Sequence, residues 1–307
     1  MVREKYASAG AGSVLFRIWE PEGPAVGVVQ LVHGIAEHIG RYAEFGKYLA
    51  AHGYAAAAED HMGHGESVSE DCLTGCVRGG WNAMVQDVHG LTALLKGRYP
   101  GLPFFLLGHS MGSFLARTYL YTFPREALTG TILSGTGWEP GLVLTAGKAI
   151  TKLETRRQGA DEPSPTLQKL MFGAYCRQFP GETSPDAWIC SDPAVVERYG
   201  QDPLCGFVPS AGLILAMLEG IGLNQRSENL AKMPKDLPVL FIAGALDPVG
   251  SNGKGVKRSL AAFRKAGMRD TALKLYEGDR HEVLNEKDKA RVWADVLAWL
   301  EEKRAAR

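Results

Sequence analysis

The sequence predicts an α/β fold in which a mostly parallel central sheet is flanked by helices and interrupted once by a mainly helical insertion. Three observations predict this fold class. Short, continuous apolar runs bounded by turn residues recur towards both ends of the chain, as expected for strands that are buried on both faces. Helical patterns with one apolar face lie between these runs. In the middle of the chain the alternation stops.

The predicted strands and helices follow one another in a regular order. The strands are residues 26–32, 54–58, 104–107, 128–133, 239–243 and 272–276. The first helix carries Tyr42, Phe45 and Leu49 on one face and ends before Gly53, a residue type that is common just after a helix. Further helical patterns cover 84–95, 111–123, a stretch that ends at Gly267, and 293–300. Because strand and helix alternate, we expect parallel pairing in most of the sheet.

The middle of the chain, residues 137–236, has a different character. Prolines cluster there, at Pro163, Pro165, Pro180, Pro185, Pro193, Pro203 and Pro209. Helical segments at 167–179 and 211–223 have no strand between them. We therefore expect a folded helical cap at 137–236, inserted into a core formed by 1–136 and 237–307. The segment 210–223 is apolar around most of its circumference, so it either packs against the core or forms a lipid-facing wall or membrane-touching rim.

Composition excludes several classes of protein. The 34 Lys and Arg residues balance 34 Asp and Glu residues, which argues against a basic nucleic-acid binder. The five cysteines are odd in number and widely spread, so a disulfide framework is not expected. Cys72 and Cys76 have no second pair to complete a zinc site, and we expect no metal or other cofactor. The sequence does not define an oligomeric state.

The N-terminal region lacks the apolar core of a secretion signal. The longest apolar run, 211–218, is far shorter than the roughly 20 residues that a membrane-spanning helix needs. With the unpaired cysteines, these features predict a soluble cytoplasmic protein.

The strongest chemical motif is Gly108-His109-Ser110-Met111-Gly112, which has the pattern G-x-S-x-G. It follows a predicted strand directly and precedes a predicted helix, the context in which this pattern holds a nucleophilic serine on a sharp turn. The flanking glycines lack a Cβ and allow the neighbouring backbone to approach closely. We therefore predict that Ser110 is a nucleophile.

A serine nucleophile needs a histidine base and a carboxylate that orients the histidine. In enzymes with this strand–turn–helix arrangement, the acid and then the histidine follow the serine along the chain. His281 is the only histidine after Ser110, and it lies in a loop between the last predicted strand and the last predicted helix. We predict that His281 is the general base.

For the acid we predict Asp247, which follows the buried strand 239–243 at a position where parallel sheets place functional loops. Asp279 competes, but it is only two residues from His281 and is too near in sequence to present its carboxylate to Nδ1. Asp202 and Asp236 lie in the insertion without a strand end beneath them.

The oxyanion of a tetrahedral intermediate needs two backbone N–H donors. In this arrangement one comes from the residue after the serine and one from the loop after an earlier strand. These are the amides of Met111 and Ile35.

Several motifs together resemble the monoacylglycerol lipase and lysophospholipase branch of the serine α/β-hydrolases. They are HGIAEHIGRY (33–42), DHMGHGES (60–67), GHSMG (108–112), AGALDPVG (243–250), GDRHEVLNE (278–286) and, more weakly, SDPAVVERYGQDPLC (191–205). The resemblance implies an α/β-hydrolase fold whose cap precedes the strand that carries the acid. It also implies a triad of Ser110, Asp247 and His281, an oxyanion hole at Ile35 and Met111, and a cap over an acyl-chain tunnel.

The predicted function is hydrolysis of a lipid-like carboxylic ester, such as a monoacylglycerol or lysophospholipid, through an acyl-enzyme. A further hypothesis is that the cap makes transient contact with a membrane or micelle surface. Three alternatives remain open. One is a general short-chain carboxylesterase, and another is a proline iminopeptidase-like amide hydrolase in which Glu162, Asp186 or Glu219 binds a substrate amine. The third is a ligand-binding α/β-hydrolase-fold protein without turnover.

Overall fold

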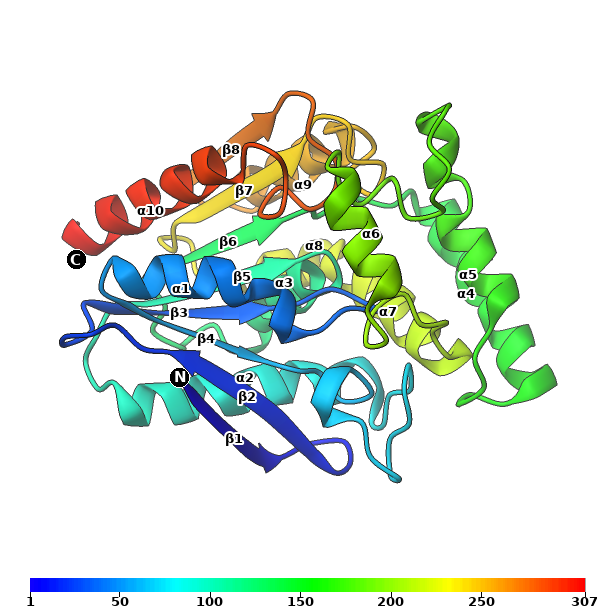
Figure 1. The fold of residues 1–307 in the computed structure, drawn as a ribbon, viewed down its shortest axis with the longest axis horizontal. Coiled ribbons are helices and arrows are strands. Elements are labelled where there is room, and N and C mark those ends of the chain that lie inside the picture. Colours follow the sequence, from blue (N-terminus) through cyan, green and yellow to red (C-terminus); the bar gives the residue numbers. More distant parts are fainter. Residues whose placement is uncertain (307) are drawn as a thin grey trace.

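The computed structural model describes residues 1–306 and confirms the predicted mostly parallel sheet flanked by helices (Figure 1). The sheet has eight strands in the order β1-β2-β4-β3-β5-β6-β7-β8. These strands are β1 (Val2–Ala7), β2 (Ser13–Trp19), β3 (Gly27–Val32), β4 (Tyr54–Glu59), β5 (Phe104–His109), β6 (Gly130–Ser134), β7 (Val239–Gly244) and β8 (Thr271–Tyr276). Strands β3 to β8 pair in parallel, while β2 pairs antiparallel with β1 and β4.

Helices cover both faces of the sheet, which explains why the central strands are continuous apolar runs. On one face lie α1 (Ala43–Ala51) and α10 (Lys289–Ala305), whose apolar side chains share a core with the strands. On the other face lie α2 (Gly80–Arg98), α3 (Met111–Thr122) and α9 (Lys254–Lys265). Every residue of β3, β4, β5 and β7 is buried. This two-sided packing fixes the strand ends that carry the site.

The chain between β6 and β7 folds into helices beside the carboxyl ends of the parallel strands (Figure 1). They are α4 (Gly141–Gln158), α5 (Pro165–Phe172), α6 (Pro193–Gln201), α7 (Ala211–Asn224) and the short α8 (Ser227–Leu230). Three of them begin at side-chain caps, because Ser164, Asp192 and Ser210 each accept a hydrogen bond from a backbone amide of the first turn. The apolar helix α7 packs against α2, α3 and α4, so most of its circumference is covered by protein.

The sequence-based prediction missed β1, β2, α4, α6 and the short α8. Strand β1 lies at the sheet edge with mostly exposed side chains, so it carries no continuous apolar run. Helix α4 buries only Leu144 and Thr151, whereas Leu142 and Leu153 are 86% and 67% exposed. The predicted helix at 167–179 is shorter than expected: α5 ends at Phe172, and a 3-10 turn follows at Tyr175–Gln178. Among residues 1–306, no helix is both long and apolar enough to cross a membrane.

Candidate active site

Ser110 sits on the sharp turn between β5 and α3. Its backbone has φ 53° and ψ −121°, a strained conformation for a residue other than glycine. The two flanking glycines are needed for close backbone approach. A Cβ on Gly112 would lie 2.0 Å from the Val32 carbonyl oxygen, and one on Gly108 would lie 2.3 Å from that of Gly112. The turn therefore holds Ser110 at the end of β5, where its side chain lines a cavity.

The structure brings His281 and Asp247 together from loops that follow β8 and β7. His281 Nδ1 lies 3.0 Å from Asp247 Oδ1, and both side chains are buried. His281 Nε2 has no hydrogen-bond partner in the described chain, and His281 lines the same cavity as Ser110. Burial opposes protonation of the imidazole, but the Asp247 carboxylate outweighs it and raises the pKa of His281 above its ordinary value. This charge arrangement favours an imidazolium at His281.

The three competing aspartates lie in other surroundings. Asp279 is buried, and burial together with nearby Glu286 and Asp288 raises its pKa to about 7. Its backbone carbonyl accepts a hydrogen bond from the Leu246 amide. Asp202 bonds His38, and Asp236 forms an exposed ion pair on the surface. None of these carboxylates bonds His281 in the described chain.

Ile35 and Met111, the two predicted oxyanion donors, both line the cavity that contains Ser110. The loop that carries Ile35 is held from the cap side. The Ala36 carbonyl accepts hydrogen bonds of 2.9 Å from both the Tyr199 hydroxyl and the Gly206 amide. Ala36 has a positive φ of 56°, so the loop adopts a strained turn at this point. Two groups of the segment between β6 and β7 therefore fix the backbone next to Ile35.

A buried ionic network supports the same loop from the core side, and the sequence analysis did not assign it. Glu37 Oε1 accepts a hydrogen bond of 2.5 Å from the Gly34 amide, and Glu37 Oε2 lies 3.0 Å from Arg41. Arg41 also forms two bonds, of 2.5 and 2.6 Å, with the carboxylate of Glu282, the residue after His281. The network thus joins the loop after β3 to the histidine loop. Glu37 and Arg41 fall inside the motif HGIAEHIGRY, but nothing in that motif points to Glu282.

The cavity above Ser110 has a volume of about 850 Å³. It is lined by Ser110 and His281 and by apolar side chains of the helices between β6 and β7. Those of α4, α5 and α7 include Val143, Leu144, Ile150, Leu167, Met217 and Ile221. This size lies in the range of pockets that enclose a small-molecule ligand, about 300–1,000 Å³. Helix α7 packs on the core helices α2 and α3, as one of its two predicted roles requires, and it also lines the cavity.

One group in the described chain has the spacing of metal ligands: His38, Asp202 and Cys205. His38 Nε2 lies 2.9 Å from Asp202 Oδ2, so these two donors already engage each other. Burial raises the pKa of the Cys205 thiol, which disfavours the thiolate form that binds metals. We therefore interpret this group as a link between the cap and the loop after β3.

Comparison with known proteins places this fold and cavity in a family. The profile of a hydrolase family described as serine aminopeptidase, S33, matches residues 23–288. A monoacylglycerol lipase of Mycolicibacterium smegmatis is 31% identical, with 97% of each chain covered. The monoglyceride lipase of Homo sapiens is 29% identical over 96% of this chain and 89% of its own.

Among solved structures, a thermostable carboxyl esterase from Bacillus coagulans, in complex with glycerol, superimposes with a TM-score of 0.92. It is 28% identical and covers 99% of this chain and 98% of its own. The chain thus belongs to the serine aminopeptidase S33 family of hydrolases and, among the serine α/β-hydrolases, to the group of the monoacylglycerol lipases.

Proposed function

We propose that the protein hydrolyses monoacylglycerols through an acyl-enzyme formed on Ser110. The observation that carries this proposal is the position of Ser110 in a mainly apolar cavity that also contains His281, with His281 bonded to Asp247. An apolar cavity suits an acyl chain, and the serine and histidine suit transfer of that chain to water. The names of the relatives in Mycolicibacterium smegmatis and Homo sapiens support the same substrate.

In this mechanism the Ser110 hydroxyl attacks the ester carbonyl while His281 Nε2 accepts its proton. Asp247 stabilises the imidazolium that forms. The amides of Ile35 and Met111 donate to the oxyanion, a contribution worth about 3 kcal/mol for each donor. His281 then protonates the leaving glycerol oxygen, and the same steps with water release the fatty acid and restore Ser110.

The test is fatty-acid release from a panel of esters that share one acyl chain. We expect Ser110→Ala to abolish release from monoacylglycerols while its urea unfolding curve remains that of the wild type. Cleavage confined to short water-soluble esters would favour a general carboxylesterase. Serine-independent release would contradict the mechanism, and stoichiometric ligand binding without release would favour a binding protein.

We also propose that residues 137–236 act as a cap that brings the cavity to a lipid surface. Helices α4 and α5 expose large apolar side chains: Leu142, Val143, Leu153 and Leu170 are each more than half exposed. Replacing Leu142 and Leu153 with serine should weaken co-sedimentation with phosphatidylcholine vesicles. The matched control is Leu94→Ser on α2, where an exposed leucine lies away from the cap. Equal loss in both proteins would contradict a cap-specific contact.

An amide hydrolase is the second candidate, because acidic side chains line the cavity. Of the three acidic residues that this alternative would use to bind an amine, Asp186 lines the cavity, whereas Glu162 and Glu219 do not. Cleavage of aminoacyl arylamides at rates that match esters would favour this candidate.

We also propose that the protein resides in a reducing compartment such as the cytoplasm. All five cysteines are free thiols, which supports this location.

A further inference from the structure

We infer that the part of the cavity beside His281 is a subsite for an alkylammonium group carried by the alcohol half of the ester. This inference rests on the proposed ester hydrolysis at Ser110 and names the kind of alcohol that the site prefers. Two independent features of the same wall support it: a group of aromatic rings, and two carboxylates without a basic partner.

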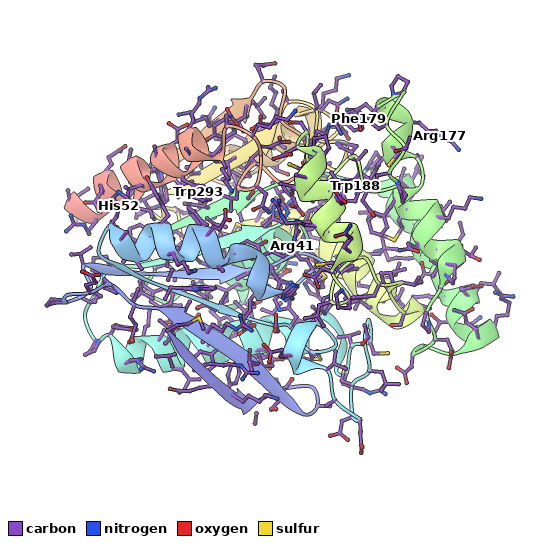
Figure 2. All side chains as sticks on the ribbon, viewed as in Figure 1. Arg41, His52, Arg177, Phe179, Trp188 and Trp293 are labelled. Carbon is purple, nitrogen blue, oxygen red and sulfur yellow. The ribbon has the colours of Figure 1, made fainter. Side chains whose placement is uncertain are left out.

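Three aromatic side chains, Phe172, Tyr175 and Trp188, gather on this wall, and all of them line the cavity. The Tyr175 and Trp188 ring centroids are 5.0 Å apart, and those of Phe172 and Trp188 are 6.0 Å apart. Trp188 lies between α6 and the α4–α5 pair (Figure 2), and its ring centroid is 5.1 Å from that of His281. Aromatic faces attract cations, and groups of such rings bind quaternary ammonium ions.

The charges on this part of the cavity favour the same ligand. Asp186 and Glu139 line the cavity: Asp186 is two positions before Trp188, and Glu139 is near enough to Tyr175 to raise the pKa of its hydroxyl. Neither carboxylate bonds another side chain in the described structure. Glu37 and Glu282 also line it, but both already pair with Arg41. Because burial raises the pKa of both Asp186 and Glu139, each unpaired carboxylate would gain from a nearby cation.

One lysine also lines the cavity. It is Lys169, which is exposed on α5 and makes no ion pair within residues 1–306. The two unpaired carboxylates, Asp186 and Glu139, outnumber this one solvated cation, so this wall of the cavity is acidic. An anionic leaving group therefore meets an unfavourable potential there, and a cationic one meets a favourable potential.

The position of this aromatic and acidic wall beside His281 suits the alcohol half of the ester rather than its acyl chain. His281 is the group that would protonate the leaving oxygen, so that oxygen must lie beside the imidazole. In an ester of a two-carbon amino alcohol, three bonds separate this oxygen from the nitrogen, a span of roughly 4 Å. The Trp188 ring lies at a comparable distance from His281, so it can contact the nitrogen. The apolar side chains of α4, α5 and α7 line the rest of the cavity, where the acyl chain can bind.

The test compares decanoylcholine with 3,3-dimethylbutyl decanoate, an uncharged ester of the same shape. We expect kcat/KM to be about 5–30-fold higher for the choline ester, as a cation–π contribution of 1–2 kcal/mol gives. Trp188→Leu and Asp186→Asn should each reduce this ratio at least threefold, and Trp188→Phe should retain most of it. The control is Glu197→Gln, which removes an exposed carboxylate on α6 that does not line the cavity.

A ratio near one in the wild type would overturn the subsite while leaving ester hydrolysis intact. A preference that persists in Trp188→Leu and Asp186→Asn would overturn the assignment to this wall. Comparing lysophosphatidylcholine with lysophosphatidylglycerol distinguishes a phospholipid head group from a simple amino-alcohol ester as the source of the ammonium. If only decanoylcholine is preferred over its uncharged analogue, and the two lysophospholipids are cleaved equally well, the source is the simple amino-alcohol ester.

A binding measurement separates this proposal from the proposed function. Choline and 3,3-dimethylbutan-1-ol can be titrated into Ser110→Ala by calorimetry, where no turnover occurs. Tighter binding of choline that is lost in Ser110→Ala/Trp188→Leu supports the subsite even if the wild type cleaves neither ester. Equal affinity for the two alcohols overturns it.

Discussion

Replacing Arg41 with methionine tests the ionic network that joins the two loops of the site. The substitution keeps an apolar stem but leaves Glu37 and Glu282 without their cation. The three side chains are only 11%, 4% and 6% exposed, so water cannot replace the lost charge. Removing one partner from a buried ion pair costs about 3–5 kcal/mol, and we expect the free energy of unfolding to fall by that amount.

The same change should slow catalysis, because Glu37 holds the Gly34 amide beside Ile35. Misplacing one oxyanion donor costs about 3 kcal/mol, so kcat should fall roughly 100-fold with little change in KM. Urea unfolding followed by tryptophan fluorescence gives the stability, and steady-state ester hydrolysis gives the rate. The matched control is Arg157→Met, which breaks an ion pair on the exposed face of α4 and should change neither quantity measurably.

A double variant, Arg41→Met with Glu282→Gln, sharpens the test. Removing the second charge relieves part of the penalty of burying an unpaired carboxylate, so this protein should be more stable than Arg41→Met alone. If Arg41→Met lost less than about 1 kcal/mol, as exposed pairs do, the network would not be the support that its burial indicates. Strictly additive losses in the double variant would contradict the coupling of the two loops.

Three further predictions concern Asp247, the sharp turn at Ser110 and the loop before His281. Since the pKa of His281 lies above its ordinary value of 6.5, kcat/KM should rise with pH through that raised pKa. Asp247→Asn should move this rise to lower pH and reduce kcat by about 10³–10⁴-fold. A rise at the same pH in the variant would refute the assignment of Asp247. Gly112→Ala should yield unfolded or inactive protein by circular dichroism and esterase assay, because its Cβ would lie 2.0 Å from the Val32 carbonyl, and a native-like variant would disprove the close approach. Asp279 has a pKa raised to about 7 in the folded protein, so the folded state binds more protons than the unfolded state and the free energy of unfolding should fall as pH rises from the ordinary carboxyl range to 7. Asp279→Asn should flatten that decline in urea titrations, and an unchanged slope would contradict it.

The central sheet could be predicted from the sequence because its strands are buried on both faces and therefore appear as apolar runs. This argument fails at the edge, where β1 exposes most of its side chains, and in α4, where Leu142 and Leu153 point to solvent. Apolar periodicity reports burial, so β1 and α4, which bury little, escape it. Strand β2 was missed although it is mostly buried, because Arg17 interrupts its apolar run.

The position of the site was predictable for a different reason. Parallel strands end at one edge of the sheet, so Ser110 after β5 and Asp247 after β7 had to lie near each other. The pairing of Arg41 with Glu282 could not be foreseen, since 241 positions separate them and charged residues of either sign are common in loops. Partners of this kind are chosen by tertiary packing and leave no local pattern.

The most direct measurement of the central claim is the mass of the covalent intermediate. After brief incubation with a monoacylglycerol or a fluorophosphonate probe, the proteolytic peptide that contains Ser110 should carry the acyl or phosphonyl group. The same peptide from Ser110→Ala should carry none. A label on any other residue, or ester hydrolysis by Ser110→Ala at the wild-type rate, would contradict the proposed nucleophile.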